Sequence, residues 1–348
     1  MTERKKLTPL SEIGEFGLID HISKQVKLKN NETIKGIGDD AAVMSYGENQ
    51  MVVTTDMLIE GVHFDLMYTP LKHLGYKAVV VNLSDVFAMN AIPKQITVSL
   101  AMSGKFTLEA INELYTGIYA ACEAYNVDLV GGDTTSSVTG MAISVTAIGA
   151  VEPGKAVYRN GAKENDLICV SGDLGAAYTG LQLLEREKEV FKSNPNVQPE
   201  LEGNDYILQR ILKPEARGDV IELLANKGVM PTSMMDISDG LSSELLHICK
   251  QSECGCRIYE EKIPINEIIK PMAKEMNIEP LVAALNGGED YELLFTISQT
   301  DYDKIKEDKS ITVIGHVTEK TSGAFLVPKS GEEIQLVAQG WTAYKTEE

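Results

Sequence analysis

Strand-like and helix-like segments alternate along most of this chain, and the alternation limits the folds that it can adopt. Short runs rich in β-branched residues, such as KQITVSLAM and MAISVTAIGAV, flank a segment with apolar residues at helical spacing, TLEAINELYTGIYAACEAYN. Interleaved strands and helices are typical of layered domains in which helices cover sheets. The sequence therefore predicts a mixed α/β (α+β) fold.

The alternation is interrupted near EPGKAVYRNGAKEND, where proline, glycine and charged residues cluster. A second series of strands and helices follows, and 348 residues are enough for two domains. We predict an N-terminal domain of residues 1–152 and a C-terminal domain of residues 153–348. Residues 186–205 are expected to form a charged surface excursion, and Ser11 is expected to cap a helix that runs to about Lys29.

The net charge of −19 argues against nucleic-acid binding, because that function needs a basic surface. No apolar run of about eighteen residues occurs, so no membrane span is expected, and the start of the chain lacks the apolar core of a secretory signal. The odd number of cysteines, five, favours reduced thiols in a cytoplasm. His247, Cys249, Cys254 and Cys256 are close in sequence, but their spacing fits no common zinc pattern, so small buried thiols are the preferred interpretation.

Acidic residues recur where strands end or helices begin, next to Gly, Ser or Thr. These groups are Asp39–Asp40, Thr54–Thr55–Asp56, Ser84–Asp85, Gly132–Asp133–Thr134 and Asp236–Ile237–Ser238–Asp239. Taken singly, each is more often a helix cap or a turn. Together they offer the hard oxygen ligands that Mg²⁺ takes, and Mg²⁺ usually combines one or two carboxylates with phosphate oxygens. The set predicts several Mg²⁺ ions around a polyphosphate.

Asp85 is the most informative of these acids because it lies within the apolar segment VVVNLSDVFAMNA. An unpaired charge would be costly there, so a metal ion or a basic partner is needed. The chain has no G-x-x-x-x-G-K-[ST] loop and no kinase H-R-D or D-F-G motif, and GIGDDA is not the dinucleotide-binding fingerprint. If a nucleotide binds, metal ions rather than a glycine loop with a lysine must hold its phosphates.

A series of motifs resembles the thiamine-monophosphate kinase family, in the superfamily of aminoimidazole-ribonucleotide synthetase. The motifs, in family order between about residues 36 and 296, are GIGDDAAV, TTDMLIEGVHF, YKAVVVNLSDVFAMNAIP, DLVGGDTT, RNGAKENDLICVSGDLGAA, MMDISDGLSSELLHI and LNGGEDYELLFT. A weaker match, Gly340–Trp341, lies near the end. The resemblance implies two layered α/β domains, a homodimer joined through the N-terminal domains, and ATP-dependent phosphorylation of thiamine monophosphate to thiamine diphosphate in the cytoplasm.

The resemblance also implies roles for individual residues. The residues implied to hold Mg²⁺ are Asp40, Thr54, Thr55, Asp56, Asp85, Asp133, Asp236 and Asp239. Those implied to contact the nucleotide are Tyr115, Gly132, Asp133, Arg159 and Ser238. Those implied to contact the substrate are His63, Glu289 and Trp341, the last at a position where the family often has Tyr or Phe. Without the resemblance, His63 would be read as structural and Arg159 as a surface residue, while Asp39 is expected only to orient its loop or to bind through water.

The implied acceptor is a phosphate monoester whose second pKa is about 6, so it needs no strong general base. We expect direct in-line transfer, helped by Mg²⁺ ions that screen the charge of both phosphate groups. Two alternatives remain. One is another ATP-dependent synthetase of the superfamily, although the ends of the chain lack the reactive cysteine of selenophosphate synthetases and hydrogenase-maturation relatives, and an aminoimidazole-ribonucleotide synthetase fits GGEDYEL less well. The other is a non-catalytic protein that binds divalent cations without turning over ATP.

Overall fold

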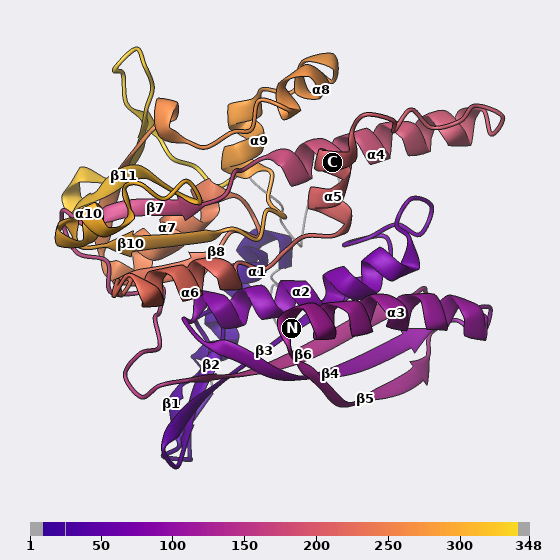
Figure 1. Cartoon of the computed structure of the whole chain (residues 1–348), viewed down its shortest axis with the longest axis horizontal. Coiled ribbons are helices and arrows are strands. Elements are labelled where there is room, and N and C mark those ends of the chain that lie inside the picture. The colour runs from indigo at the N-terminus through magenta and orange to yellow at the C-terminus, as the bar shows by residue number, and fades with distance from the viewer. Residues whose placement is uncertain (1–9, 25, 340–348) are drawn as a thin grey trace, which may run out of the picture.

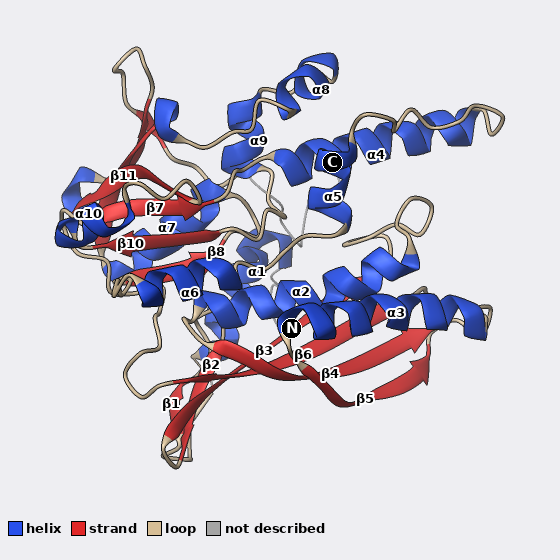
Figure 2. Cartoon of the chain, viewed as in Figure 1, coloured by secondary structure: helices blue, strands red, loops and turns tan. Residues whose placement is uncertain are grey.

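Two β-sheets with helices packed between and around them make up this protein (Figures 1 and 2). The computed structural model describes residues 10–24 and 26–339. Strands and helices occur in both halves of the chain, and each half builds one sheet. This architecture confirms the predicted mixed α/β class with two layered units.

The first sheet has six strands in the order β1-β2-β3-β6-β4-β5, with β5 at one edge. Only β4 and β5 pair in parallel, and the other neighbours are antiparallel. Along β6, residues alternate between buried and partly buried, as expected for a sheet with one covered face. The strands are β1 (Thr33–Lys35), β2 (Ala42–Tyr46), β3 (Asn49–Ile59), β4 (Ile92–Met102), β5 (Asp128–Ser136) and β6 (Ala142–Val151).

Two long helices, α2 (Leu71–Ala88) and α3 (Leu108–Tyr125), cover one face of this sheet (Figure 2). They cross at two glycines that allow the backbones to touch. A Cβ atom on Gly75 would lie 2.0 Å from the carbonyl oxygen of Leu114, and one on Gly117 would lie 1.8 Å from that of Lys72. The absence of side chains at these two glycines therefore determines where α2 and α3 cross.

The second sheet has seven strands in the order β13-β12-β9-β11-β7-β10-β8. Its strands are β7 (Leu167–Ser171), β8 (Ser233–Asp236), β9 (Cys254–Tyr259), β10 (Leu293–Ile297), β11 (Ile311–Glu319), β12 (Ala324–Val327) and β13 (Ile334–Gln335). The other helices are α1 (Leu10–Ser23), α4 (Ala176–Ser193), α5 (Asp205–Leu212), α6 (Gly218–Asn226), α7 (Leu241–Ser252), α8 (Ile269–Glu275), α9 (Pro280–Asn286) and α10 (Tyr302–Ile305).

Helix α2 is the central element of the molecule because it contacts both halves of the chain. It packs on β3, β4, β6 and α3 on one side and on β8, α5 and α6 on the other. Its residues are therefore buried nearly all round, which explains the apolar sequence of this segment. Neither α2 nor any other helix in the described ranges is long and apolar enough to cross a membrane.

Several local predictions are wrong at the level of single elements. Ser11 lies inside α1 and not at its cap, and this helix ends at Ser23 and not near Lys29. Residues 186–193 continue α4, so only the rest of the expected excursion is loop. Gly132 and Asp133 lie within β5 and not in a turn. No prediction was made for the short elements β1, β2, β9, β13, α5, α8, α9 and α10.

Candidate active site between the two sheets

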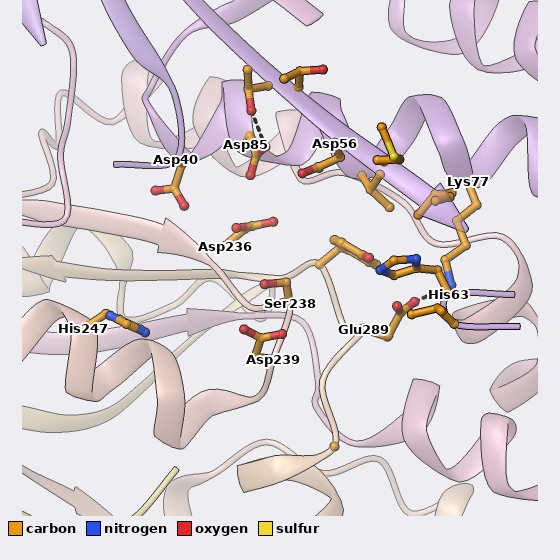
Figure 3. A pocket seen from close by; sticks show the side chains of 18 of the residues that line it. Asp40, Asp56, His63, Lys77, Asp85, Asp236, Ser238, Asp239, His247 and Glu289 are labelled. Carbon is orange, nitrogen blue, oxygen red and sulfur yellow. Dashed lines mark hydrogen bonds and ion pairs between the residues drawn. The ribbon is translucent and has the colours of Figure 1, made fainter. Parts of the chain in front are cut away.

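A cavity of about 1290 Å³ lies between the two halves of the chain. Its walls come from α1, the β1–β2 loop, β3, α2, α5, the β8–α7 turn and residues 286–291. Most of the predicted metal and substrate residues line it, from Asp40 at one side to His63 and Glu289 at the other (Figure 3). The fold therefore brings residues that are far apart in sequence to the wall of one cavity.

Asp40, Asp85 and Asp236 form an acidic cluster in this cavity. Each offers a carboxylate oxygen, and these oxygens all lie within 4.8 Å of one another. Asp40 follows β1, Asp85 lies in α2 and Asp236 ends β8, so the acidic cluster joins both halves of the chain. Figure 3 shows the three side chains facing a common space. This geometry brings together three of the acids that the sequence pattern singled out.

Hydrogen bonds hold two members of the acidic cluster in place. The Thr54 hydroxyl donates to Oδ2 of Asp85 at 2.7 Å, and the Ser84 hydroxyl donates to Oδ2 of Asp236 at 2.6 Å. Because Ser84 belongs to α2 and Asp236 to β8, the second bond also ties the two halves together. Each carboxylate is therefore oriented before any ligand arrives.

Arg159 holds the third member of the acidic cluster. Its guanidinium donates to Oδ1 of Asp40 at 2.6 Å, while its backbone N–H donates to Asp39 at 2.7 Å. Asp39 also pairs with Lys35 at 2.6 Å, so its carboxylate is engaged in fixing the loop. Asp40 is the residue of the pair that faces the acidic cluster, as the resemblance implied, and Arg159 reaches the cavity from the boundary segment.

The acidic cluster carries more negative charge than its protein partners neutralise. Burial is the main cause that raises the pKa of Asp236 to about 7, and the charge of Asp40 adds to it. Burial, followed by the charges of Asp56 and Asp236, also raises the pKa of Asp85 well above its usual range. For Asp40, burial outweighs the opposing effect of Arg159, so its pKa is raised as well. A cation between these groups would restore their ionised forms.

The residues of the acidic cluster fit Mg²⁺. All donor atoms are carboxylate or hydroxyl oxygens, which suit a hard divalent cation. Oδ2 of Asp40 is buried and has no hydrogen-bond partner within the described ranges, so it is oriented without being satisfied by the protein. A buried oxygen of this kind is costly unless a ligand completes it.

Other predicted metal residues lie around the same cavity with different roles. Asp56, within β3, and Asp239, after β8, both line it. Thr55 lines it too, but its hydroxyl donates to the carbonyl of Val145 in β6 at 3.1 Å. Ser238 lies in the β8–α7 turn, and its carbonyl accepts a hydrogen bond from the N–H of Glu289 at 2.6 Å. The turn after β8 and the turn that carries Glu289 are thus joined through their backbones.

The other end of the cavity gathers His63, Glu289 and a residue that the sequence analysis did not select, Lys77 (Figure 3). Lys77 pairs with Glu289 across the two halves of the chain. Nδ1 of His63 accepts from the N–H of Ile59 at 2.9 Å, so a neutral His63 carries its proton on Nε2. Burial lowers the pKa of His63, and this keeps the ring neutral near pH 7.

Tyr115, Gly132 and Asp133 lie elsewhere, around a second and smaller hollow. Gly132 and Asp133 belong to β5, which β6 and β4 separate from β3 in the sheet. Three strand spacings amount to about 14 Å. Within one chain these residues therefore do not meet the acidic cluster. The remaining predicted substrate residue, Trp341, lies outside the described residues.

Two residues of the site escaped sequence reasoning. Ser84 was noted only as the neighbour of Asp85, and Lys77 was not noted at all. A lysine in the apolar run YKAVVVNLSDVF is the signal that was available, because a buried lysine needs a partner as much as a buried aspartate does.

Comparisons with known proteins agree with this fold. Residues 38–151 match the family model described as AIR synthase related protein, N-terminal domain. Residues 152–327 match the model of the corresponding C-terminal domain. The chain thus has the two-domain make-up of AIR synthase related proteins, and its acidic cluster lies between the two matched parts.

Individual relatives place the chain in one family within this class. The chain is 36% identical to thiamine-monophosphate kinase of Bacillus subtilis (strain 168) over 342 residues, which is 96% of this chain and 100% of that protein. It is also 36% identical to thiamine-monophosphate kinase of Aquifex aeolicus (strain VF5), over 89% of this chain and 97% of that protein. This chain belongs to the thiamine-monophosphate kinase family, which confirms the resemblance drawn from its motifs.

A solved structure supports the same family assignment. AaThiL complexed with AMPPCP and TMP superimposes with a TM-score of 0.84 at 34% sequence identity. The match covers 98% of this chain and 100% of that chain. The described architecture, with its two sheets, is therefore shared with that structure.

Proposed function

We propose that this protein transfers the γ-phosphate of ATP to thiamine monophosphate, giving thiamine diphosphate and ADP. The observation that carries the proposal is the acidic cluster of Asp40, Asp85 and Asp236 in a cavity between the two matched domains. Its relative AaThiL is complexed with AMPPCP, an ATP analogue, and TMP. An oxygen of the acceptor phosphate attacks the γ-phosphorus, and the bond from that phosphorus to the β,γ-bridging oxygen breaks.

The chain supplies two phosphate-handling sets of residues in this proposal. Arg159 has the planar, always charged fork that suits a phosphate contact. Mg²⁺ bound here would neutralise and align the phosphate oxygens of both substrates. The residues proposed to hold Mg²⁺ are Asp40, Thr54, Thr55, Asp56, Asp85, Asp133, Asp236 and Asp239. The residues proposed to contact the nucleotide are Tyr115, Gly132, Asp133, Arg159 and Ser238.

The acceptor end of the cavity would bind thiamine monophosphate through groups of complementary character. Glu289 offers a carboxylate to the cationic, amino-bearing ring system, and Nε2–H of neutral His63 can donate a hydrogen bond. We also propose that Trp341 stacks on these rings, since an aromatic face attracts a cation. No residue near the acceptor needs to act as a strong base, because a phosphate monoester with a pKa of about 6 is already ionised.

We further propose that the working form is a homodimer in which β5 brings residues to the site of the partner. Strand β5 is an edge strand with an exposed apolar residue, Val130, and Val138 beyond it is fully exposed at 100%. Exposed edge strands with apolar residues are usually covered by another part of the protein or by a partner chain. A second copy packed along β5 would cover the edge, and Tyr115, Gly132 and Asp133 would then lie against the phosphates held by the other chain.

A coupled ADP-release assay tests the proposed reaction. ADP should appear only when ATP, Mg²⁺ and thiamine monophosphate are all present. Unphosphorylated thiamine is the matched control, and it should not support release because it lacks the attacking phosphate oxygen. ADP release that is independent of thiamine monophosphate would contradict the proposal, and binding of divalent cations without any release would favour the non-catalytic alternative.

The transfer should be direct, without a phosphorylated enzyme. The acceptor phosphate is itself the nucleophile, and the hydroxyls beside the acidic cluster, those of Thr54 and Ser84, are hydrogen-bonded to carboxylates that would hold Mg²⁺. With γ-phosphate made chiral by oxygen isotopes, the product should show inversion at phosphorus. Retention of configuration, or a protein labelled by [γ-³²P]ATP that passes its label to the acceptor, would rule out a single in-line step.

A further inference from the structure

Lys77 is a buried cation in the wall of the cavity. It lies in the middle of α2, where its neighbours in sequence are apolar, and it is only 4% exposed. Its ammonium pairs with the carboxylate of Glu289 and donates to the carbonyl oxygen of Ile211 in α5 at 3.3 Å. Ordering and burying a lysine is costly, and here the cost is met by contacts to two segments of the other half of the chain.

The backbone of the segment that carries Glu289 is itself tightly determined. Gly288, Glu289 and Tyr291 all have positive φ angles, of 71°, 62° and 51°. Such conformations are unfavourable for residues with a side chain and persist only when the surroundings impose them. Hydrogen bonds from Glu289 N–H to Ser238 (2.6 Å) and from Tyr291 N–H to the carbonyl of residue 237 (2.8 Å) impose them here.

The contact with Lys77 determines which oxygen of the Glu289 carboxylate is available to a ligand. Lys77 engages Oε2, and in the described part of the chain no hydrogen bond or ion pair is made to Oε1. The side chain of Glu289 is 26% exposed, so Oε1 is open to the cavity. One oxygen of the carboxylate is therefore neutralised and fixed, while the other remains to accept a hydrogen bond from a ligand.

The pairing of Glu289 with Lys77 affects metal binding because the rest of the cavity is acidic and would attract cations. Asp56 and the acidic cluster line the same space, and a further unpaired carboxylate in it would compete for Mg²⁺. Two other cations of the cavity wall are already engaged, Arg159 with Asp40 and Lys188 with Asp65 and Glu185. Lys77 is thus placed to neutralise Glu289, since His63 beside them has a pKa lowered mainly by burial.

We propose that Lys77 is a positioning residue that determines acceptor specificity. It holds Glu289 so that Oε1 receives the amino-bearing, cationic part of the acceptor, and it keeps this carboxylate from becoming an additional Mg²⁺ ligand. The inference deepens the proposed function and rests on it. Lys77 acts through Glu289 and does not itself touch the phosphate groups.

The test is a set of kinetic measurements on Lys77→Met, Lys77→Arg, Glu289→Gln and the double variant Lys77→Met/Glu289→Gln. Lys77→Met should raise the KM for thiamine monophosphate at least about tenfold, because it leaves the Glu289 carboxylate without its partner and no longer held in place. The kcat and the KM for ATP should stay within about twofold. Lys77→Arg should restore much of the acceptor affinity, and the double variant should match Glu289→Gln alone.

A dependence on Mg²⁺ separates this role from a structural one. In Lys77→Met, but not in the wild type or the double variant, the KM for thiamine monophosphate should rise further as free Mg²⁺ increases. Lys213→Met is the matched control, because Lys213 also lies against α2, 4.3 Å from the ring centre of Tyr76, and pairs with Glu215 outside the cavity. It should leave all these parameters unchanged.

The outcomes distinguish the inference from the reaction on which it rests. If the wild type turns over thiamine monophosphate and Lys77→Met has wild-type kinetics, the inference alone is wrong. It is also wrong if the effects of Lys77→Met and Glu289→Gln multiply in the double variant, because Lys77 would then touch the acceptor directly. Absence of turnover in the wild type overturns both proposals. If Lys77→Met does not fold by circular dichroism, the uncharged double variant compared with Glu289→Gln gives the same decision.

Discussion

Replacing Asp85 by asparagine should lower kcat by about a hundredfold to a thousandfold, the range seen when one preorganised charge-stabilising group is lost. Asparagine has the same shape and can still accept the hydrogen bond from Thr54, which is 2.7 Å long, so the fold should be kept. What it removes is one of the three carboxylates of the acidic cluster. Turnover at saturating Mg²⁺, with circular dichroism on the same samples, measures the effect.

Thermal melts test the loss of Mg²⁺ binding separately from the loss of turnover. In the wild type, Mg²⁺ should raise Tm because it binds the folded state, and Asp85→Asn should lose most of this rise. Without Mg²⁺, the variant should melt at a temperature no lower than the wild type. Burial and neighbouring charges raise the pKa of Asp85, so its ionised form is unfavourable in the metal-free protein.

Asp39→Asn is the matched control for this experiment. Asp39 adjoins Asp40 in sequence but is engaged with Lys35 and with the backbone of Arg159, away from the acidic cluster. Its replacement should reduce kcat far less than that of Asp85 and should leave the Mg²⁺-dependent rise in Tm in place. Near-normal turnover by Asp85→Asn at saturating Mg²⁺ would remove Asp85 from the metal site.

Asp133→Asn should also be nearly inactive, although Asp133 does not line the main cavity of its own chain. The proposed dimer explains this, since Asp133 would complete the site of the partner. Asp85→Asn and Asp133→Asn chains, each inactive alone, should therefore complement each other. A heterodimer of the two would contain one site with both residues intact, and it should regain about half of the wild-type activity per dimer.

Heterodimers purified through two different affinity tags provide the measurement, and analytical ultracentrifugation confirms that they are dimers. Homodimers of each variant, carried through the same purification, are the controls. If the heterodimer is as inactive as the homodimers, both residues act in the same chain or Asp133 has another role. A wild-type protein that is fully active as a monomer would also contradict the proposed arrangement.

The fold class was open to prediction because it depends on local patterns. Strands such as β6 and helices such as α3 follow from alternation and from helical spacing of apolar residues. The expectation that Gly132 and Asp133 mark the end of a strand was wrong for a physical reason. Gly132 is there because β4 approaches closely, and a Cβ atom would lie 1.8 Å from the carbonyl oxygen of Val98. A glycine required by close packing and one required by a turn look alike in a sequence.

The site was predictable where its residues share one chemistry. Asp40, Asp85 and Asp236 were selected as acids beside small polar residues, and the motif order pointed to the same positions. Lys77 was not selectable in this way, because the meaning of a lysine in an apolar helix depends on its partner. That partner, Glu289, is 212 residues away in sequence, and only the packing of α2 against the second half of the chain brings them together.

The position of α2 has a consequence for how this molecule unfolds. Its side chains belong to a single apolar core that also includes Met234, Leu293 and Phe295 from the second sheet. Separating the two sheets would leave one face of α2 in water, so part of the apolar core exists only while the two halves are packed together, although the second half also has an apolar core of its own. We therefore expect a ligand that binds the cavity wall formed by α2 to stabilise the contact between the two halves as well as the first sheet.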